Sequence, residues 1–374
     1  ILQTRLDDGA FDSGRVLKDL DTSGDEISTE VTIKPGHIYS YRITAFNNGG
    51  KSFPSEVLSV GVPEDGCGKS VLVVNNFTRV SSPAWFDSPE YAGFDGDLDA
   101  GVPYVKEINF IGQQYQFRRG LPWLDDDNPG FGAAWTDEAG KVFAGNTFDY
   151  CGIHGKAIMK AGYAFHSSSV AAYTSSAEDL AGNDMALDLV CGKQVTTVVG
   201  SGKVPDRYEV FPTALRQAIR NYTDKGGNVI VSGANIGTDV WDGIYPVRKD
   251  SINTVSSKEF VTKPLGYRWM TNYASRNATV AAKGDSPLKL EQKEFSFHKD
   301  RNPKIYNVET PDGIVPSSER SRTFLRYTDT NISAGTCFEG TGYRAVCIGF
   351  PLEGVKEQDT LESLMKDVMN FLDR

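Results

Sequence analysis

The sequence has no long hydrophobic run, and this absence excludes a helical membrane span within it. No apolar stretch in the 374 residues approaches the roughly 20 that a helix needs to cross a bilayer. A basic surface is missing too, because the net charge is -10 and the basic residues are scattered. Binding to nucleic-acid phosphates needs such a surface, so we expect no nucleic-acid partner.

Cysteines are few and widely spaced, and glycine-rich phosphate loops are absent. The five cysteines are Cys67, Cys151, Cys191, Cys337 and Cys347, with no C-x-x-C pair. This spacing argues against a zinc site or a disulfide framework, although it leaves room for one bridge. No G-x-G-x-x-G or G-x-x-x-x-G-K-[ST] follows a strand-like run. We therefore expect neither a nucleotide nor another cofactor.

Residues 1–62 contain short runs in which apolar and polar residues alternate, the period of β-strands. These runs are "EISTEVTI" (26–33), "IYSYRITAFN" (38–47) and "EVLSVGV" (56–62), with turns at Pro35-Gly36 and at 47–50. The stretch resembles the last three strands of a fibronectin type III domain, with Pro35 and Tyr39 in its tyrosine corner. A complete sandwich takes roughly 100 residues, so the resemblance implies missing N-terminal strands and other domains upstream of Ile1.

Residues 66–374 alternate strand and helix patterns. Strands are predicted at 69–77, 228–232 and 343–351, and helices at 211–226 and 361–372. Such alternation predicts an α/β fold with a mostly parallel sheet and helices on both sides. Two β-rich insertions, at about 78–150 and 254–345, break the alternation, and we expect them to cover a cleft at the sheet edge.

Two strand ends resemble the class I glutamine amidotransferase-like fold, a flavodoxin-like relative. "GANIG" (233–237) occupies the place of its G-x-C-x-G nucleophile elbow, and "GFPLE" (349–353) the place of its F-H-P-E motif. Ala234 replaces the nucleophilic cysteine, no histidine follows His298, and Glu353 alone is retained. Because a catalytic triad works as a unit, the resemblance implies a pseudoenzyme.

Longer stretches, among them "FDYCGIHGKAIMKAGYAF" (148–165), are similar to secreted proteins of the Bacteroidetes type. Those proteins pair a fibronectin type III module with this α/β domain, and many are labelled xanthan lyase. The resemblance implies an extracytoplasmic, non-catalytic accessory region that binds a polysaccharide or cell-wall glycan. The alternative is a polysaccharide lyase or peptidoglycan hydrolase, with its catalytic centre around His154 or upstream of residue 1.

Ligands of parallel α/β sheets bind at the carboxyl ends of the strands. The polar side chains expected at or just beyond these ends are the candidate ligand-binding residues. They are Asn75, Asn76, Ser232, Asn235, Asp239 and Glu353.

The segment "FDYCGIHGK" holds the candidate catalytic residues His154, Asp149 and Tyr150. Asp149 is placed to orient His154 as a general base, with Tyr150 as its partner in lyase chemistry. The alternative is a helix N-terminus at which Asp149 caps backbone amides and His154 is a polar core or turn residue.

The first insertion offers two further patterns. Asp95, Asp97 and Asp99 begin like a calcium loop, but Ala100 takes the glycine position, so an acidic surface turn is the competing interpretation and no metal is expected. Aromatic residues crowd the same insertion, where they either stack on sugars or pin the insertion to the domain. These aromatic residues are Trp85, Phe86, Tyr91, Tyr104, Tyr115, Phe117, Trp123, Phe131 and Trp135.

Overall fold

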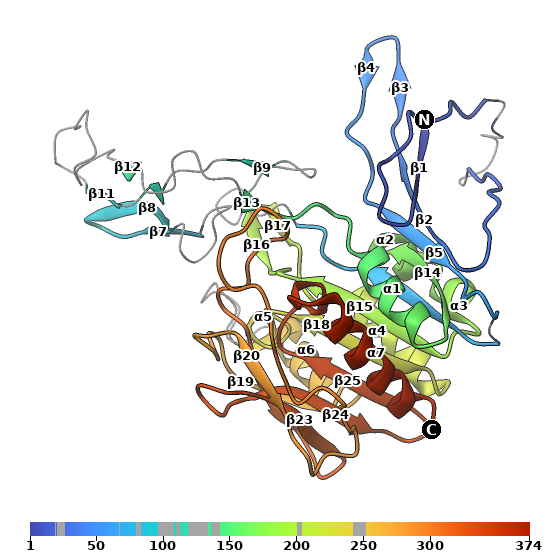
Figure 1. Ribbon diagram of the computed structural model, residues 1–374. Coiled ribbons are helices and arrows are strands. Elements are labelled where there is room, and N and C mark those ends of the chain that lie inside the picture. Colours follow the sequence, from blue (N-terminus) through green and yellow to red (C-terminus); the bar gives the residue numbers. More distant parts are fainter. Residues whose placement is uncertain are drawn as a thin grey trace.

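The structure is a computed structural model that describes residues 1–18, 20, 27–66, 68–79, 84–95, 108–109, 113–114, 116–118, 134–135, 143–199, 204–241 and 252–374. A 12-stranded sheet runs through the molecule (Figure 1). Its strands, in spatial order, are β1 (Leu2–Leu6), β2 (Ile38–Ile43), β5 (Leu58–Gly61), β14 (Ala164–Ser169), β6 (Ser70–Asn75), β15 (Ala186–Gly192), β18 (Asn228–Gly233), β25 (Arg344–Ile348), β24 (Ser333–Glu339), β23 (Ser321–Tyr327), β20 (Thr279–Ala282) and β21 (Glu294–Ser296).

The sheet is mixed, so the prediction of a mostly parallel flavodoxin-like sheet preceded by a fibronectin type III sandwich is wrong. Four pairings, from β14 to β25, are parallel, and seven are antiparallel. The N-terminal strands continue the sheet through β5 and β14. Strands of the second insertion extend it on the other side, from β24 to β21. The alternating period identified many of these strands, but strand period carries no information on which strands pair.

Gly61 shows how the N-terminal strands reach the central sheet. It pairs with Phe165 of β14, the register pair that joins β5 to β14. A Cβ atom at Gly61 would lie 2.4 Å from Met159 Sδ and 2.9 Å from the Phe165 ring. Only a residue without a side chain allows this close approach, so the junction depends on glycine at this position.

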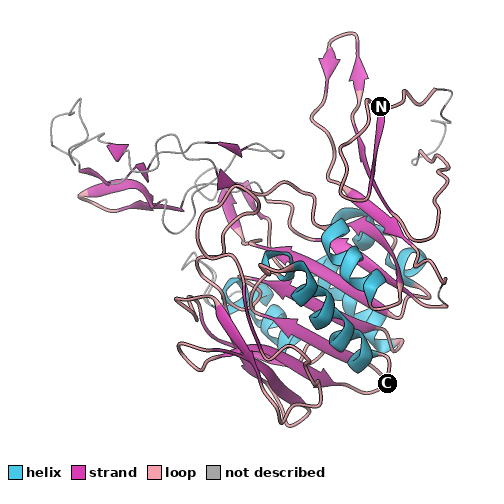
Figure 2. Cartoon of the chain, in the orientation of Figure 1, coloured by secondary structure: helices cyan, strands magenta, loops and turns pink. Residues whose placement is uncertain are grey.

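Helices cover both faces of the central strands (Figure 2). One face packs against α1 (Cys151–Lys160) and α7 (Gln358–Leu372), and the other against α2 (Val170–Ser175), α3 (Ala177–Ala181), α4 (Thr213–Asp224) and α6 (Ile252–Thr262). In β6, Val71 and Val73 face the first layer, whereas Leu72 and Val74 face the second. A strand that is buried on both faces has a continuous run of apolar residues, and the run "VLVV" at 71–74 is an example.

Short elements complete the described fold. They are β3 (Phe46–Asn47), β4 (Gly50–Lys51), β7 (Ala84–Asp87), β8 (Tyr91–Asp95), β9 (Ile108–Asn109), β10 (Gln113–Gln114), β11 (Gln116–Arg118), β12 (Ala134–Trp135), β13 (Phe143–Ala144), β16 (Thr197–Val199), β17 (Val204–Arg207), β19 (Tyr267–Thr271), β22 (Gly313–Pro316), α5 (Thr238–Trp241) and η3 (Leu352–Gly354). The hairpin predicted around 47–50 is confirmed by the pairing of β3 with β4. The strand predicted at 26–33 is wrong over residues 27–33, which lie outside regular structure although their period is that of a strand.

Candidate functional site

His154 lies between two carboxylates beneath the carboxyl ends of the central strands. Its Nδ1 atom is 2.7 Å from Asp188 Oδ2, and its Nε2 atom is 3.2 Å from Glu353 Oε2. Helix α1 supplies the histidine, β15 supplies Asp188 and η3 supplies Glu353. The side chains of His154, Asp188 and Glu353 are each 0% exposed. The arrangement is a buried ion cluster with no access to solvent.

The electrostatics of this cluster keep the imidazole protonated. Desolvation by burial lowers the pKa of His154, but the charges and hydrogen bonds of Asp188 and Glu353 outweigh it and raise the pKa to about 10. At neutral pH the ring is therefore an imidazolium whose two N–H groups both donate to carboxylates. A general base accepts a proton at a neutral ring nitrogen, so the burial and the raised pKa of His154 disfavour this role, and its catalytic function stays a prediction.

Tyr306 also contacts this cluster, and two buried polar atoms, one on Ser232 of β18 and one on Asp188 of the cluster itself, lack partners in the described part of the chain. The Tyr306 hydroxyl donates to Glu353 Oε1 over 2.7 Å, which leaves Glu353 bonded through both oxygens. Ser232 Oγ and Asp188 Oδ1 are buried without a hydrogen-bond partner among the described residues. Ala234, at the corner after β18, is 2% exposed and donates its backbone N–H to Gly192 O over 2.8 Å. The corner is thus closed as well as lacking a nucleophile.

Asp149 and Tyr150 have partners of their own. Asp149 accepts two hydrogen bonds from the Arg5 guanidinium, at 2.5 and 2.6 Å, which ties β1 to the start of α1. The Tyr150 hydroxyl donates to Gly145 O over 3.2 Å and accepts from Thr147 N over 3.0 Å. Asp188 therefore occupies the position next to His154 that the sequence had suggested for Asp149.

Asn75 ends β6 and Asn76 follows it, and the two residues are 2% and 1% exposed. The Asn75 amide donates to Glu56, and its oxygen accepts from Phe77 N over 3.2 Å. The Asn76 amide donates to Val210 O over 2.8 Å. Both amides thus hold neighbouring loops in place.

Asn235 and Asp239, two further candidate ligand-binding residues at this edge, also form hydrogen bonds with other residues of the chain. Asn235 donates to the backbone oxygens of Lys193 and Gln194, over 3.4 and 3.3 Å. Asp239 accepts from Thr196 N over 2.8 Å and from Val210 N over 2.9 Å. The carboxyl edge is therefore bound together by its own polar groups, and a role for them in ligand binding stays a prediction.

The calcium-like pattern lies largely outside the described residues. Asp97 and Asp99 fall there, and Asp95 is described only as the backbone end of β8. Of the aromatic residues of the first insertion, Tyr104, Tyr115, Trp123 and Phe131 also fall outside. Within the described part of the chain, no group of three or more His, Cys, Asp or Glu side chains is arranged to hold a metal ion.

Sequence reasoning missed Asp188 and Asp312. Asp188 interrupts the apolar run "MALDLVCG", and a carboxylate buried in a strand is costly without a partner, so the run itself held the signal. Asp312 accepts from Gly237 N and Thr238 N, over 2.6 and 2.9 Å, and so fixes the corner after β18. Burial raises the pKa of Asp312 to about 7, although its hydrogen bonds with Thr238 and Gly237 lower it. Asp312 lies in a stretch without a clear period, where no sequence signal pointed to it.

Among the described residues, none of the helices combines the length and the apolar character that crossing a bilayer requires. This finding agrees with the prediction of no transmembrane segment. It is the part of the partner predictions that the structure supports directly.

No protein-family model matches the chain, and no curated protein matches it. Solved structures with some likeness include a cold-adapted β-galactosidase from Rahnella sp. R3, with 12% identity and a TM-score of 0.36 over 60% of this chain and 27% of that one. An exo-β-1,4-mannosidase from Opitutaceae bacterium strain TAV5 shows 8% identity and a TM-score of 0.34 over 59% and 30%. The cytoplasmic protein STM3548 from Salmonella typhimurium shows 11% identity and a TM-score of 0.40 over 81% and 98%. The chain thus spans less than a third of the two glycosidases, and likenesses this weak assign it to no family.

Proposed function

We propose that this chain is a non-catalytic accessory region of an extracytoplasmic protein and that it binds carbohydrate. The observation that carries the first part is the environment of His154, whose side chain is fully buried and hydrogen-bonded at both ring nitrogens and whose pKa is raised to about 10. The competing lyase or hydrolase needs a neutral imidazole that reaches its substrate. Ala234 removes the other group on which acyl-transfer chemistry at this edge would depend.

The carbohydrate part rests on the sequence. It combines the resemblance to secreted proteins labelled as xanthan lyases with the aromatic residues of the first insertion. Large aromatic side chains provide flat, rigid surfaces with a polar edge, which suits them to sugar rings.

Two measurements test this function. Incubation with xanthan and with peptidoglycan, followed by the absorbance of unsaturated products and by released reducing ends, is expected to show no turnover. A glycan array followed by calorimetry is expected to show binding to at least one polysaccharide. Turnover that disappears in His154→Gln, in a variant that folds by circular dichroism, would establish an enzyme instead. An array without signal would refute carbohydrate binding.

A further inference from the structure

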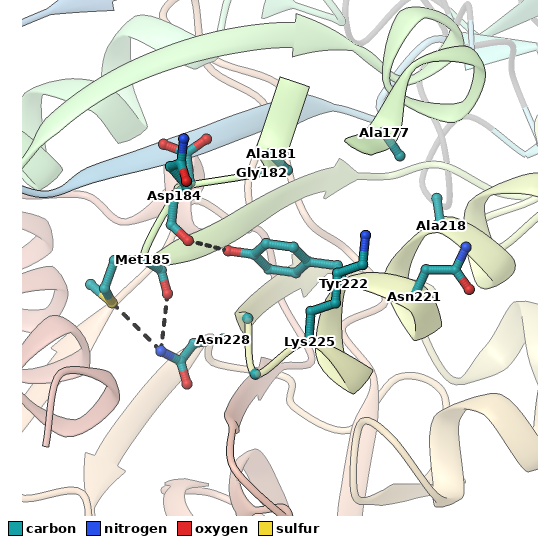
Figure 3. A pocket seen from close by; sticks show the side chains of 13 residues that line it. Ala177, Ala181, Gly182, Asp184, Met185, Ala218, Asn221, Tyr222, Lys225 and Asn228 are labelled. Carbon is teal, nitrogen blue, oxygen red and sulfur yellow. Dashed lines mark hydrogen bonds between the residues drawn. The ribbon is translucent and has the colours of Figure 1, made fainter. Parts of the chain in front are cut away.

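Two adjoining pockets lie at the amino ends of the parallel strands, the edge opposite to the one that holds His154. The first, of about 340 Å³, lies between α3, α4 and the starts of β15 and β18 (Figure 3). The second, of about 490 Å³, lies beside the start of β25 and the end of α7. Gly226 and Asn228 line both pockets. Both volumes fall in the range of roughly 300–1,000 Å³ that is usual for small-molecule sites.

The Tyr222 ring crosses the middle of the first pocket (Figure 3). Its hydroxyl donates to Asp184 O over 2.8 Å, which fixes the orientation of the ring. The ring also packs against Gly227, where an added Cβ atom would lie 2.3 Å from a ring carbon. The pocket is therefore built around an aromatic platform held at its hydroxyl and supported by backbone.

Small residues and amides surround this platform. Ala181, Gly182 and Ala218 line the pocket and leave space beside the ring. Asn183 and Asn221 add exposed amides at the same site, and Asn221 Oδ1 accepts from Gln217 Nε2 over 2.8 Å. An amide donates and accepts hydrogen bonds, as a sugar hydroxyl does, so the two groups are complementary.

The second pocket continues the same chemistry. It is lined by the aromatic ring of Tyr343 and by charges of both signs, with Arg344 and Arg374 offset by Glu339 and Asp373. The balance of charge favours an uncharged ligand over an anion or a cation.

Asn228 stands between the two pockets and is held on both sides. It donates to Met185 O over 3.0 Å and to Leu372 O over 3.3 Å, and it accepts from Arg344 N over 2.8 Å. Its bonds tie the starts of β15, β18 and β25 to the end of α7, so the wall shared by the pockets is preorganised.

We infer that these two pockets bind neighbouring uncharged sugar units of one glycan chain. The inference rests on the proposed carbohydrate-binding function and gives it a site and a ligand class. The apolar face of one unit lies on Tyr222, and its hydroxyls bond to Asn183 and Asn221. The next unit occupies the pocket beside Tyr343.

The test uses the full chain and the neutral glycan that gives the strongest array signal. Gly182→Trp is designed to obstruct the first pocket, which Gly182 lines, and it introduces no backbone strain because Gly182 has a φ of -60°. Asn221→Ala removes one amide from that pocket. We expect calorimetry to show at least about a tenfold rise in Kd for the tryptophan variant and about a fivefold rise for Asn221→Ala.

Matched controls isolate the pocket. Gly284→Trp places the same side chain at a glycine with open space around it, and Gln217→Ala breaks the Gln217–Asn221 bond while keeping the Asn221 amide. Both controls are expected to bind like the parent chain. Equal affinity in all four folded variants would overturn the pocket and leave the proposed function intact. A parent chain that binds no glycan would overturn both.

Discussion

His154 Nδ1 and Asp188 Oδ2 are 2.7 Å apart in a part of the molecule where both side chains are fully buried. The pair joins α1 to the central strand β15, and Glu353 closes it from the other side of the ring. A cation between two carboxylates removes repulsion that these carboxylates would otherwise exert on each other in a medium of low dielectric constant. The contact therefore contributes to the stability of the fold.

Replacing His154 by alanine is expected to lower the free energy of unfolding by about 3–5 kcal/mol, because it leaves two buried carboxylates without their cation. Denaturant unfolding measures the loss. His37→Ala is the control, since His37 is 45% exposed in its pair with Asp7 and its loss should cost less than about 1 kcal/mol. Equal effects of the two substitutions would contradict the role of the buried cluster.

The same cluster predicts how stability depends on pH. The pKa of His154 is raised from 6.5 in the unfolded chain to about 10 in the folded protein, so the folded state holds the proton more tightly. Its stabilising contribution is fully present below about pH 6.5 and is lost as the pH rises through about 10. Thermal unfolding between pH 6 and 10.5 measures this decline. His154→Gln should show a shallower decline over the same range, and parallel curves would contradict the prediction.

The Arg5–Asp149 pair attaches the N-terminal strand β1 to the start of α1, so its loss should loosen the N-terminal strands. Its side chains are 14% and 10% exposed, and the contact is bidentate. We expect Asp149→Asn to lower the free energy of unfolding by about 2 kcal/mol. Hydrogen exchange should become faster in β1 and β2. In Asp8→Asn, the matched control at a residue that is 84% exposed, exchange should stay as in the parent chain.

A cysteine at position 234 is expected to remain unreactive. Ala234 is 2% exposed, so a thiol at this position would have little access to solvent or to a reagent. Ala234→Cys should gain no glutaminase activity, and iodoacetamide should label the new thiol only after unfolding. Thr29→Cys, in an exposed segment, serves as the control that labels at once. Rapid labelling of residue 234 in the native protein would show that the corner is open.

The elements of the central fold were predictable from sequence because their signals are local. The apolar face that includes Leu215, Ala218 and Ile219 predicted α4, and the structure places that helix at Thr213–Asp224 with these side chains buried. The apolar runs likewise predicted β6, β18 and β25. The absence of a nucleophile at position 234 was also predictable from the sequence, because an alanine side chain has no nucleophilic group in any fold.

The pairing of strands and the partners of charged groups were decided only by the tertiary structure. Strand period is the same for a separate sandwich and for strands that extend another sheet, so strands over residues 38–61 could be expected while the predicted sandwich was wrong. Asp149 is near His154 in sequence, yet Asp188 and Glu353, 34 and 199 residues away, bind its ring. Helix α1 directs the ring toward β15 and η3, and these distant elements meet there through packing of the apolar layers that surround them.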